Sequence, residues 1–151
     1  MDRREFSSFL PMLMALPALA PAAGAQGPAI PPAVLPRLES GKFVWGEAYG
    51  SLRPARTSHR FLIGMLPDNI RLEAHVTFLA PGAPPEPVEH HKHSEMWFVR
   101  EGSVTLMTDG VTRTLKAGDM GLAVAGTDHE VSNASKTEPA SYFVISCGPP
   151  E

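Results

Sequence analysis

The sequence has little of what several large classes of protein require. Cys147 is the single cysteine among 151 residues, so an intrachain disulfide and a cysteine-based zinc site are both excluded. The 13 lysines and arginines are scattered rather than clustered and the formal net charge is −3, so we expect no nucleic-acid partner. A chain of this length is typical of one domain with a hydrophobic core of ordinary proportions.

Long apolar runs are also missing. The main candidate, residues 9–20, is interrupted by proline and is too short for a permanent membrane span. Small residues at 23–25 follow it, where a signal peptidase would cut. The arginine pair at 3–4, just before Phe6, resembles the twin-arginine signal of bacteria, with an ordinary secretory signal as the alternative. We therefore predict a signal peptide over residues 1–25, cleaved before Gln26, and export to the bacterial periplasm.

Helical periodicity is absent from the rest of the chain. Residues 26–42 are rich in proline, which predicts an extended linker or arm. Residues 43–151 contain short β-type runs separated by glycine and proline, which is typical of an all-β sandwich or barrel. We predict a loop over 53–58 and a hairpin turn at Asp109-Gly110. The predicted strands cover residues 43–49, 60–66, 70–79, 96–100, 103–108, 111–116, 120–125, 129–133 and 140–146.

The predicted strand at 70–79 is amphipathic. Its even-numbered positions from Leu72 to Phe78 are apolar, and its odd-numbered positions from Arg71 to Thr77 are polar. Side chains alternate across a strand, so this pattern predicts a half-buried strand. His75 lies on its polar face, and we expect His75 and His59 to be solvated or hydrogen-bonded rim residues.

A group of possible metal ligands precedes the predicted strand at 96–100. Three of the six histidines and two glutamates lie within residues 89–95, and an apolar run ending at Gly102 follows. Glu89, His91, His93 and Glu95 share one parity along the chain, whereas His90 has the other. His90 and His91 therefore cannot both face one metal ion without a β-bulge.

A second stretch, residues 118–133, holds one more histidine at the start of a predicted strand, His129. If the two stretches pair in space, imidazole and carboxylate groups converge on one point. Imidazole and carboxylate ligands without a thiolate suit one divalent first-row transition metal ion, namely manganese, iron, nickel or zinc. The alternative is a histidine-rich surface turn that binds metals adventitiously.

The two stretches resemble the two motifs of the cupin superfamily. In the first motif, Glu95 and Gly102 have the expected seven-residue separation, and His91 fits the second motif histidine. In the second motif, the spacing fits throughout, with a single replacement of the usual proline by valine; its matching residues are Gly118, Val124, Gly126, His129 and Asn133. The resemblance covers roughly residues 60–146 and implies a jelly-roll β-barrel, the double-stranded β-helix of cupins.

The resemblance also implies a ligand set, with one departure. Glu89 stands where the first motif histidine is usual. The implied metal ligands are His91, Glu95 and His129, and the fourth is left open between Glu89, His93 and His90, in that order. Glu95 is either a ligand or, released from the ion, the general base. Trp97 and Val99 are expected to line a substrate pocket or to belong to the core.

Two functions follow as expectations. The first is a metal-dependent enzyme for a small oxygen-bearing substrate, with an oxygenase-type reaction ahead of isomerase or lyase chemistry. The second is a non-catalytic protein that binds a small carbohydrate or organic acid, with or without metal. Met96 and Phe98 face away from the predicted ligands and suggest burial against a second sheet or subunit, so we expect a homodimer.

Overall fold

The computed structural model describes residues 34–53 and 55–151. The predicted signal peptide and the first part of the proline-rich segment lie outside the described residues. Of that segment, residues 34–42 are described, and one parallel bridge joins Arg37 to Met65. Within the described ranges, no helix is long and apolar enough to cross a membrane.

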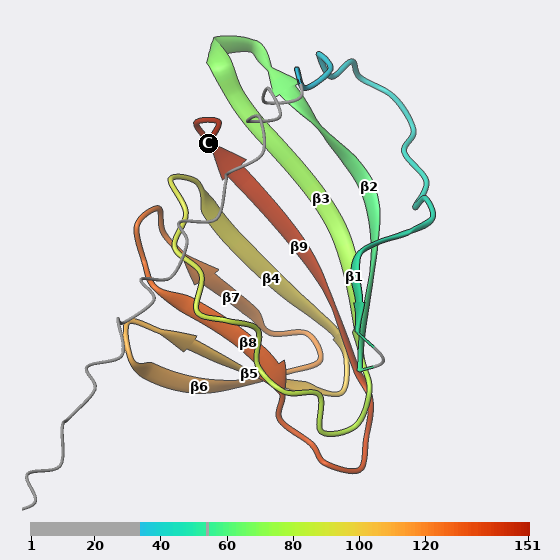
Figure 1. Ribbon diagram of the computed structural model, residues 1–151, viewed down its shortest axis with the longest axis vertical. Helices are drawn as coiled ribbons and strands as arrows, with labels where there is room; N and C mark the ends of the chain where they lie inside the picture. Colours follow the sequence, from blue (N-terminus) through green and yellow to red (C-terminus); the bar gives the residue numbers. More distant parts are fainter. Residues whose placement is uncertain (1–33, 54) are drawn as a thin grey trace, which may run out of the picture. The chain divides into compact units, whose positions relative to one another are not determined.

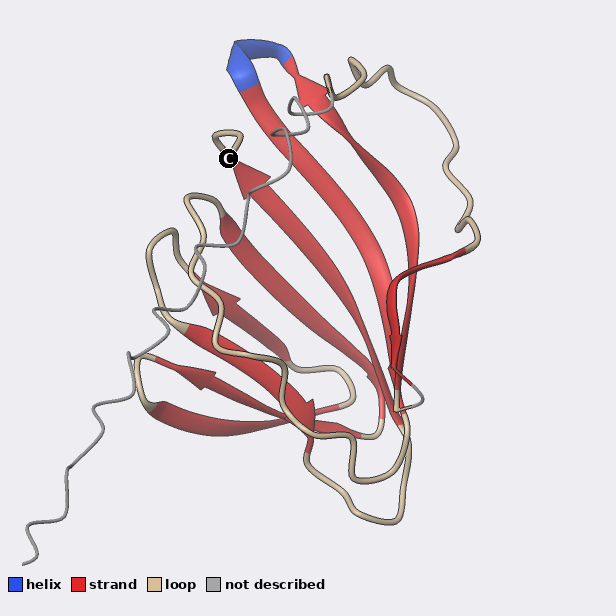
Figure 2. Cartoon of the chain, viewed as in Figure 1, coloured by secondary structure: helices blue, strands red, loops and turns tan. Residues whose placement is uncertain are grey.

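Two antiparallel sheets make up the described part of the chain (Figure 1). The six-stranded sheet has the order β1-β2-β3-β9-β4-β7, and the three-stranded sheet has the order β6-β5-β8. The helical element of these residues is a 3-10 turn, Pro67–Asn69, drawn blue in Figure 2. The strands are β1 Ala48–Arg53, β2 Arg56–Leu66, β3 Ile70–Leu79, β4 Ser94–Glu101, β5 Ser103–Thr108, β6 Val111–Lys116, β7 Met120–Ala123, β8 His129–Asn133 and β9 Ala140–Gly148.

From β3 onward, the strands lie where the sequence predicted them, to within two residues at their ends. The predictions for the residues before β3 need correction. The strand predicted at 43–49 lies at Ala48–Arg53, and the predicted loop at 53–58 already contains the start of β2. The reason is pairing: Arg56 lies opposite Leu79, so β2 follows the whole length of β3. The backbone groups of β3 supply partners that local turn propensity does not reveal.

The hydrophobic core fills the space between the two sheets at one end. Fully buried side chains from the six-stranded sheet, such as Val99 and Tyr142, belong to the same buried cluster as Val104, Leu106 and Val131 of the three-stranded sheet. Each side chain of this kind stabilises the fold by about 1.5–3 kcal/mol. The opposite end of the same interior is lined by polar side chains and holds a cavity.

Two turns fix the first ligand-bearing strand and the hairpin after it. Gly102, between β4 and β5, has φ +70°, and a Cβ atom there would lie 2.3 Å from the carbonyl oxygen of Pro139. Glycine is therefore required at this position. Asp109 and Gly110 have φ values of 46° and 76°, as the predicted hairpin turn between β5 and β6 requires.

Candidate metal centre

A cavity of about 440 Å³ lies between the two sheets. Its wall is formed by residues of β2, β3, β4, β8 and β9, together with the loop that precedes β4 and Glu151 after β9. Histidines and glutamates from β4, β8 and this loop line it, as do Arg71, Glu73 and His75 of β3. The cavity is therefore polar on both sides, although it adjoins the hydrophobic core.

A backbone bridge brings the two ligand-bearing stretches together. The amide of Glu89 donates to the carbonyl of His129 at 2.9 Å, and the amide of His129 donates back at 3.0 Å. This isolated pair fastens the loop before β4 to the start of β8. The convergence expected from the sequence is thus achieved by main-chain hydrogen bonds between residues that are forty positions apart.

Glu95 is held in place from two sides. Its Oε1 accepts a hydrogen bond of 2.6 Å from the Ser146 hydroxyl, and His93 Nε2 lies 3.3 Å from the same oxygen. Its Oε2 lies 3.3 Å from Nε2 of His129. Burial works to raise the pKa of Glu95, but the His129 imidazole and the Ser146 hydroxyl outweigh it and lower the pKa to about 2. The carboxylate is therefore ionised at neutral pH.

His129 is oriented as metal-binding histidines usually are. Its Nδ1 lies 2.9 Å from the carbonyl oxygen of Thr127, which assigns the proton of the neutral ring to Nδ1. The buried Nε2 then presents a lone pair toward Glu95 and has no hydrogen-bond partner among the described residues. Two lone pairs 3.3 Å apart repel each other unless a proton or a cation lies between them.

The protonation of His129 reflects the same need for positive charge. Burial of the imidazole works to lower its pKa, yet the carboxylate of Glu95 and the carbonyl of Thr127 outweigh it, so the pKa of His129 is raised. Without a cation, a proton on Nε2 relieves the repulsion from Glu95. A metal ion bound at this nitrogen would serve the same purpose.

His91 connects the remaining ligand candidates. Its Nε2 lies 3.1 Å from Oε2 of Glu89, and its Nδ1 lies 3.3 Å from Oε2 of Glu151. Its ring stacks on that of His93, with centroids 4.6 Å apart. Two groups have donor atoms within 4.8 Å of one another, and His91 belongs to both; they are Glu89, His91 and His129, and His91, His93 and Glu151.

Glu151 is a site residue that sequence reasoning missed. It follows β9, where no motif marks it, and its side chain also accepts a hydrogen bond from the Lys92 amide. The chain reaches this place because it passes closely by His93 at Gly148, where a Cβ atom would lie 2.7 Å from the Cα of His93. No feature of the sequence signals this approach.

The histidines and glutamates described above form a cluster that suits a divalent cation; they are Glu89, His91, His93, Glu95, His129 and Glu151. With neutral imidazoles, the three carboxylates of Glu89, Glu95 and Glu151 give it a formal charge of −3. Charges that are this close and partly buried need compensation. Nitrogen and carboxylate donors without a thiolate fit a first-row divalent ion.

Other residues singled out from the sequence lie in different surroundings. His90 points away from the cluster, with a side chain that is 64% exposed and pairs with Asp128 at 2.9 Å. Trp97 lines the cavity, with its ring 5.2 Å from that of His129. Val99 is fully buried in the hydrophobic core and is not part of the cavity wall.

The two histidines expected at the rim differ from each other. Nδ1 of His59 donates to the carbonyl of Gly46 at 3.0 Å, and its ring packs against Trp45. His75 instead lines the cavity, with Nδ1 3.6 Å from Oε1 of Glu73. The expectation of a rim position was wrong for His75, because the polar face of β3 points into the interior.

The β3 side of the cavity is dominated by arginine. Glu73 accepts from Arg60 Nε at 3.0 Å through Oε1 and contacts Nη2 of Arg71 through Oε2. Burial works to raise the pKa of Glu73, but the contact with His75 and the charge of Arg60 outweigh it and lower the pKa to about 2. One carboxylate thus serves two guanidinium groups.

A third arginine, Arg56, has hydrogen-bond acceptors at both of its terminal nitrogens. It donates to the Tyr142 hydroxyl at 2.6 Å and to the carbonyl of Val131 at 2.8 Å, and it pairs with Glu86 at 3.1 Å. These bonds join β2 and β9 of one sheet to β8 of the other. Burial raises the pKa of Tyr142, so its hydroxyl stays protonated.

Comparison with known proteins identifies the fold. Residues 75–146 match the family model described as Cupin domain. The chain resembles an RmlC-like cupin from Shewanella frigidimarina, with a TM-score of 0.58, 23% identity and coverage of 74% of this chain and 95% of that one. KdgF from Halomonas gives a TM-score of 0.54 and 21% identity, covering 75% and 96%.

A further structural match is the DMSP lyase DddQ from Ruegeria pomeroyi. Its TM-score is 0.53 at 22% identity, and the match covers 70% of this chain and 56% of that one. A search of curated protein sequences found no match. At these identities the likeness establishes the fold alone.

Proposed function

From a cupin fold that encloses six clustered histidines and glutamates, we propose that this protein binds one divalent first-row transition metal ion and acts as a metal-dependent enzyme. The supporting observation is the approach of His129 Nε2 to the ionised Oε2 of Glu95, at 3.3 Å, next to the group formed by Glu89, His91 and His129. We assign His91, His129, Glu95 and Glu89 as the ligands. A set with two carboxylates favours harder ions such as manganese or iron(II).

We choose Glu89 as the fourth ligand by comparing its position with those of the alternatives, His93 and His90. Glu89 Oε2 lies 3.1 Å from Nε2 of His91, and both residues group with His129. His93 is engaged elsewhere, because its Nε2 contacts Oε1 of Glu95, the oxygen that faces away from His129. His90 points toward Asp128, outside the cavity.

The reaction we propose is proton transfer on a small oxygen-bearing substrate, which makes the protein an isomerase or a lyase. A bound ion would polarise a carbonyl or enediol oxygen of the substrate. A carboxylate with a pKa of about 2 is a weak base at neutral pH, so Glu95 suits metal binding better than proton abstraction. We place isomerase or lyase chemistry ahead of the oxygenase-type reaction expected first from the sequence, because a histidine of the cavity wall offers a buried nitrogen that could accept the proton.

His93 is our candidate for the general base. When its Nε2 donates to Glu95, its Nδ1 is left as the proton acceptor. This Nδ1 belongs to a residue of the cavity wall, is buried without a hydrogen bond in the described part of the chain, and lies 3.6 Å from Oε1 of Glu151. Glu95 would thus orient the base and hold the ion with different oxygens.

The test begins with elemental analysis of protein isolated from its native source without a polyhistidine tag. We expect about one equivalent of a single divalent metal. Metal-free protein whose unfolding temperature does not respond to added manganese, iron(II), nickel or zinc would instead support the non-catalytic binding protein. Deuterium incorporation from D₂O next to the carbonyl of 2-hydroxy and 2-oxo acids, followed by NMR, then tests proton transfer. Consumption of oxygen without deuterium exchange would instead favour the oxygenase-type reaction.

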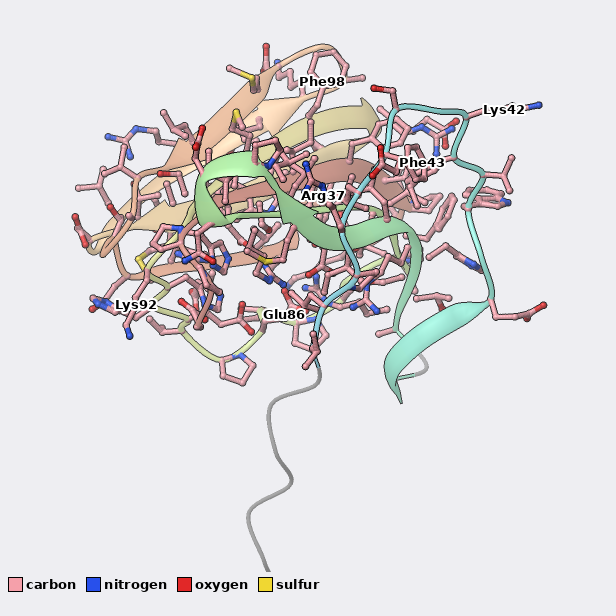
Figure 3. All side chains as sticks on the ribbon, turned by 90° about the horizontal axis from the view of Figure 1, so that it is seen from above. Arg37, Lys42, Phe43, Glu86, Lys92 and Phe98 are labelled. Carbon is pink, nitrogen blue, oxygen red and sulfur yellow. The ribbon has the colours of Figure 1, made fainter. Side chains whose placement is uncertain are left out.

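We also propose a homodimer that uses the outer face of the larger sheet. Phe98, Met120, Leu122 and Ile145 are 42–59% exposed there, and the strand register places them next to one another. Figure 3 shows Phe98 on the outside of the strands. A contiguous apolar patch of this kind favours association. Leu122→Asp should convert a dimer to a monomer in sedimentation velocity, and a monomeric wild-type protein would refute the proposal.

Export to the bacterial periplasm remains our proposal for the location. It is supported by the arginine pair at 3–4 and the small residues at 23–25. N-terminal sequencing of the mature protein should begin at Gln26. Retention of residues 1–25 in the isolated protein would contradict it.

A further inference from the structure

Arg71 is a charged side chain of the cavity wall that the metal centre does not use. It lies on the inward face of β3, together with Glu73, His75 and Thr77. Its Nη2 contacts Glu73, but its Nη1 is buried and has no hydrogen-bond partner among the described residues. Leaving a buried donor unsatisfied costs about 1–3 kcal/mol, and more for a charged group.

Arg56 shows that this chain can satisfy an arginine in the same interior. Its terminal nitrogens are bonded to Tyr142, Glu86 and Val131, and its side chain is 10% exposed. Among the described residues, Arg71 lacks an equivalent set of acceptors, because Glu73 contacts its Nη2 and its buried Nη1 has no hydrogen-bond partner. A buried guanidinium nitrogen in this position calls for an anion.

Strand register places β3, which carries Arg71, two strands away from β4, which carries the proposed ligand Glu95. Glu73 of β3 is opposite Ser146 of β9, which is itself opposite Glu95 of β4. Two strand spacings separate Glu73 from Glu95, which is about 10 Å. Arg71, two residues before Glu73 on the same strand, lines the same cavity as the proposed metal ligands.

We propose that the ligand is a small carboxylate with a second oxygen function, and that Arg71 binds its carboxylate. The carboxylate would meet Arg71 and the second oxygen would face the proposed ion, and small 2-hydroxy and 2-oxo acids carry both groups. The planar guanidinium offers Nη1 to a carboxylate oxygen, a geometry that arginine favours. The metal-facing half of this inference rests on the proposed function, whereas the carboxylate contact does not.

Matched acids and amides test the inference. Lactate and 2-hydroxybutyrate, each against its primary amide, are titrated into full-length mature protein by calorimetry. We expect the acids to bind about tenfold more tightly than the amides, and Arg71→Gln to abolish this preference. Arg71→Lys keeps the charge but loses the planar fork, so it should retain part of the preference. Arg100→Gln is the matched control, because Arg100 stacks on Phe143 on the outer face of the same sheet.

Repeating the titrations after chelation separates this inference from the proposed function. An acid preference that depends on Arg71 and survives in metal-free protein supports the inference even if no metal is ever found. Equal binding of acid and amide, equal binding by wild type and Arg71→Gln, or no binding at millimolar concentration overturns it. In those cases a stoichiometric metal ion would still leave the metal centre standing. Circular dichroism of each variant checks that it is folded.

Discussion

Two regions of one cavity differ in the sign of the charge that a ligand would have to supply. The acidic region has three carboxylates that lie against imidazole nitrogens; it is formed by Glu89, His91, His93, Glu95, His129 and Glu151. The basic region, formed by Arg71, Glu73 and His75, holds a buried guanidinium nitrogen of Arg71 that has no hydrogen-bond partner in the described part of the chain. Neither region is balanced by itself. The difference indicates that a cation belongs to the first region and an anion to the second.

Removing a ligand from the acidic region should have the largest effect. His91→Ala and His129→Ala each delete an imidazole that faces a carboxylate at 3.1–3.3 Å. We expect metal affinity to fall at least 100-fold, since even residues that merely support ligands account for 10- to 100-fold. Competition titration with a fluorescent chelator measures this. Unchanged affinity in both variants would show that the ion, if bound, lies elsewhere.

Arg56→Gln tests whether Arg56 stabilises the fold rather than binding a ligand. The substitution leaves Glu86 and the buried hydroxyl of Tyr142 without their partner. Breaking a buried pair of this kind costs about 3 kcal/mol, so we expect the free energy of unfolding in urea to fall by that amount. The preference for acids over amides should persist in the folded variant. A stable variant that has lost the preference would assign the anion site to Arg56 instead of Arg71.

Glu73→Gln tests the basic region through pH. A folded-state pKa of about 2, below the ordinary value of 4.5, stabilises the protein above pH 4.5 and ceases to do so as the pH falls toward 2. The shift corresponds to about 3 kcal/mol. Wild-type unfolding temperatures should therefore drop between pH 5 and pH 2 more steeply than those of Glu73→Gln. Glu138→Gln, at an exposed position, is the control and should follow the wild type.

His90→Ala should have the smallest effect. The side chain is 64% exposed and pairs with the exposed Asp128, and surface pairs contribute about 0–1 kcal/mol. We expect unchanged metal affinity and a change in unfolding free energy below about 0.5 kcal/mol. Loss of metal from this variant, measured by the same chelator competition, would reopen the choice of the fourth ligand.

The sequence allowed the fold to be predicted well because its turns are explicit. Glycine and proline separate the strands along the chain, and the first motif contains Gly102, a position where the backbone requires glycine. The first strand was misplaced because β2 extends to Arg56 only in the presence of β3. Pairing between distant segments overrides local turn signals when it satisfies backbone donors and acceptors.

The sequence by itself determined which residues share a face: Glu89, His91, His93 and Glu95 before and within β4, and Arg71, Glu73, His75 and Thr77 on β3. The period of two residues that places them together is a local property of an extended chain. Only the tertiary structure decided that the polar face of β3 points inward and that Glu151 reaches His91. Those outcomes depend on closing one sheet against another, through contacts such as Glu73 opposite Ser146, and such long-range register leaves no local pattern in the chain.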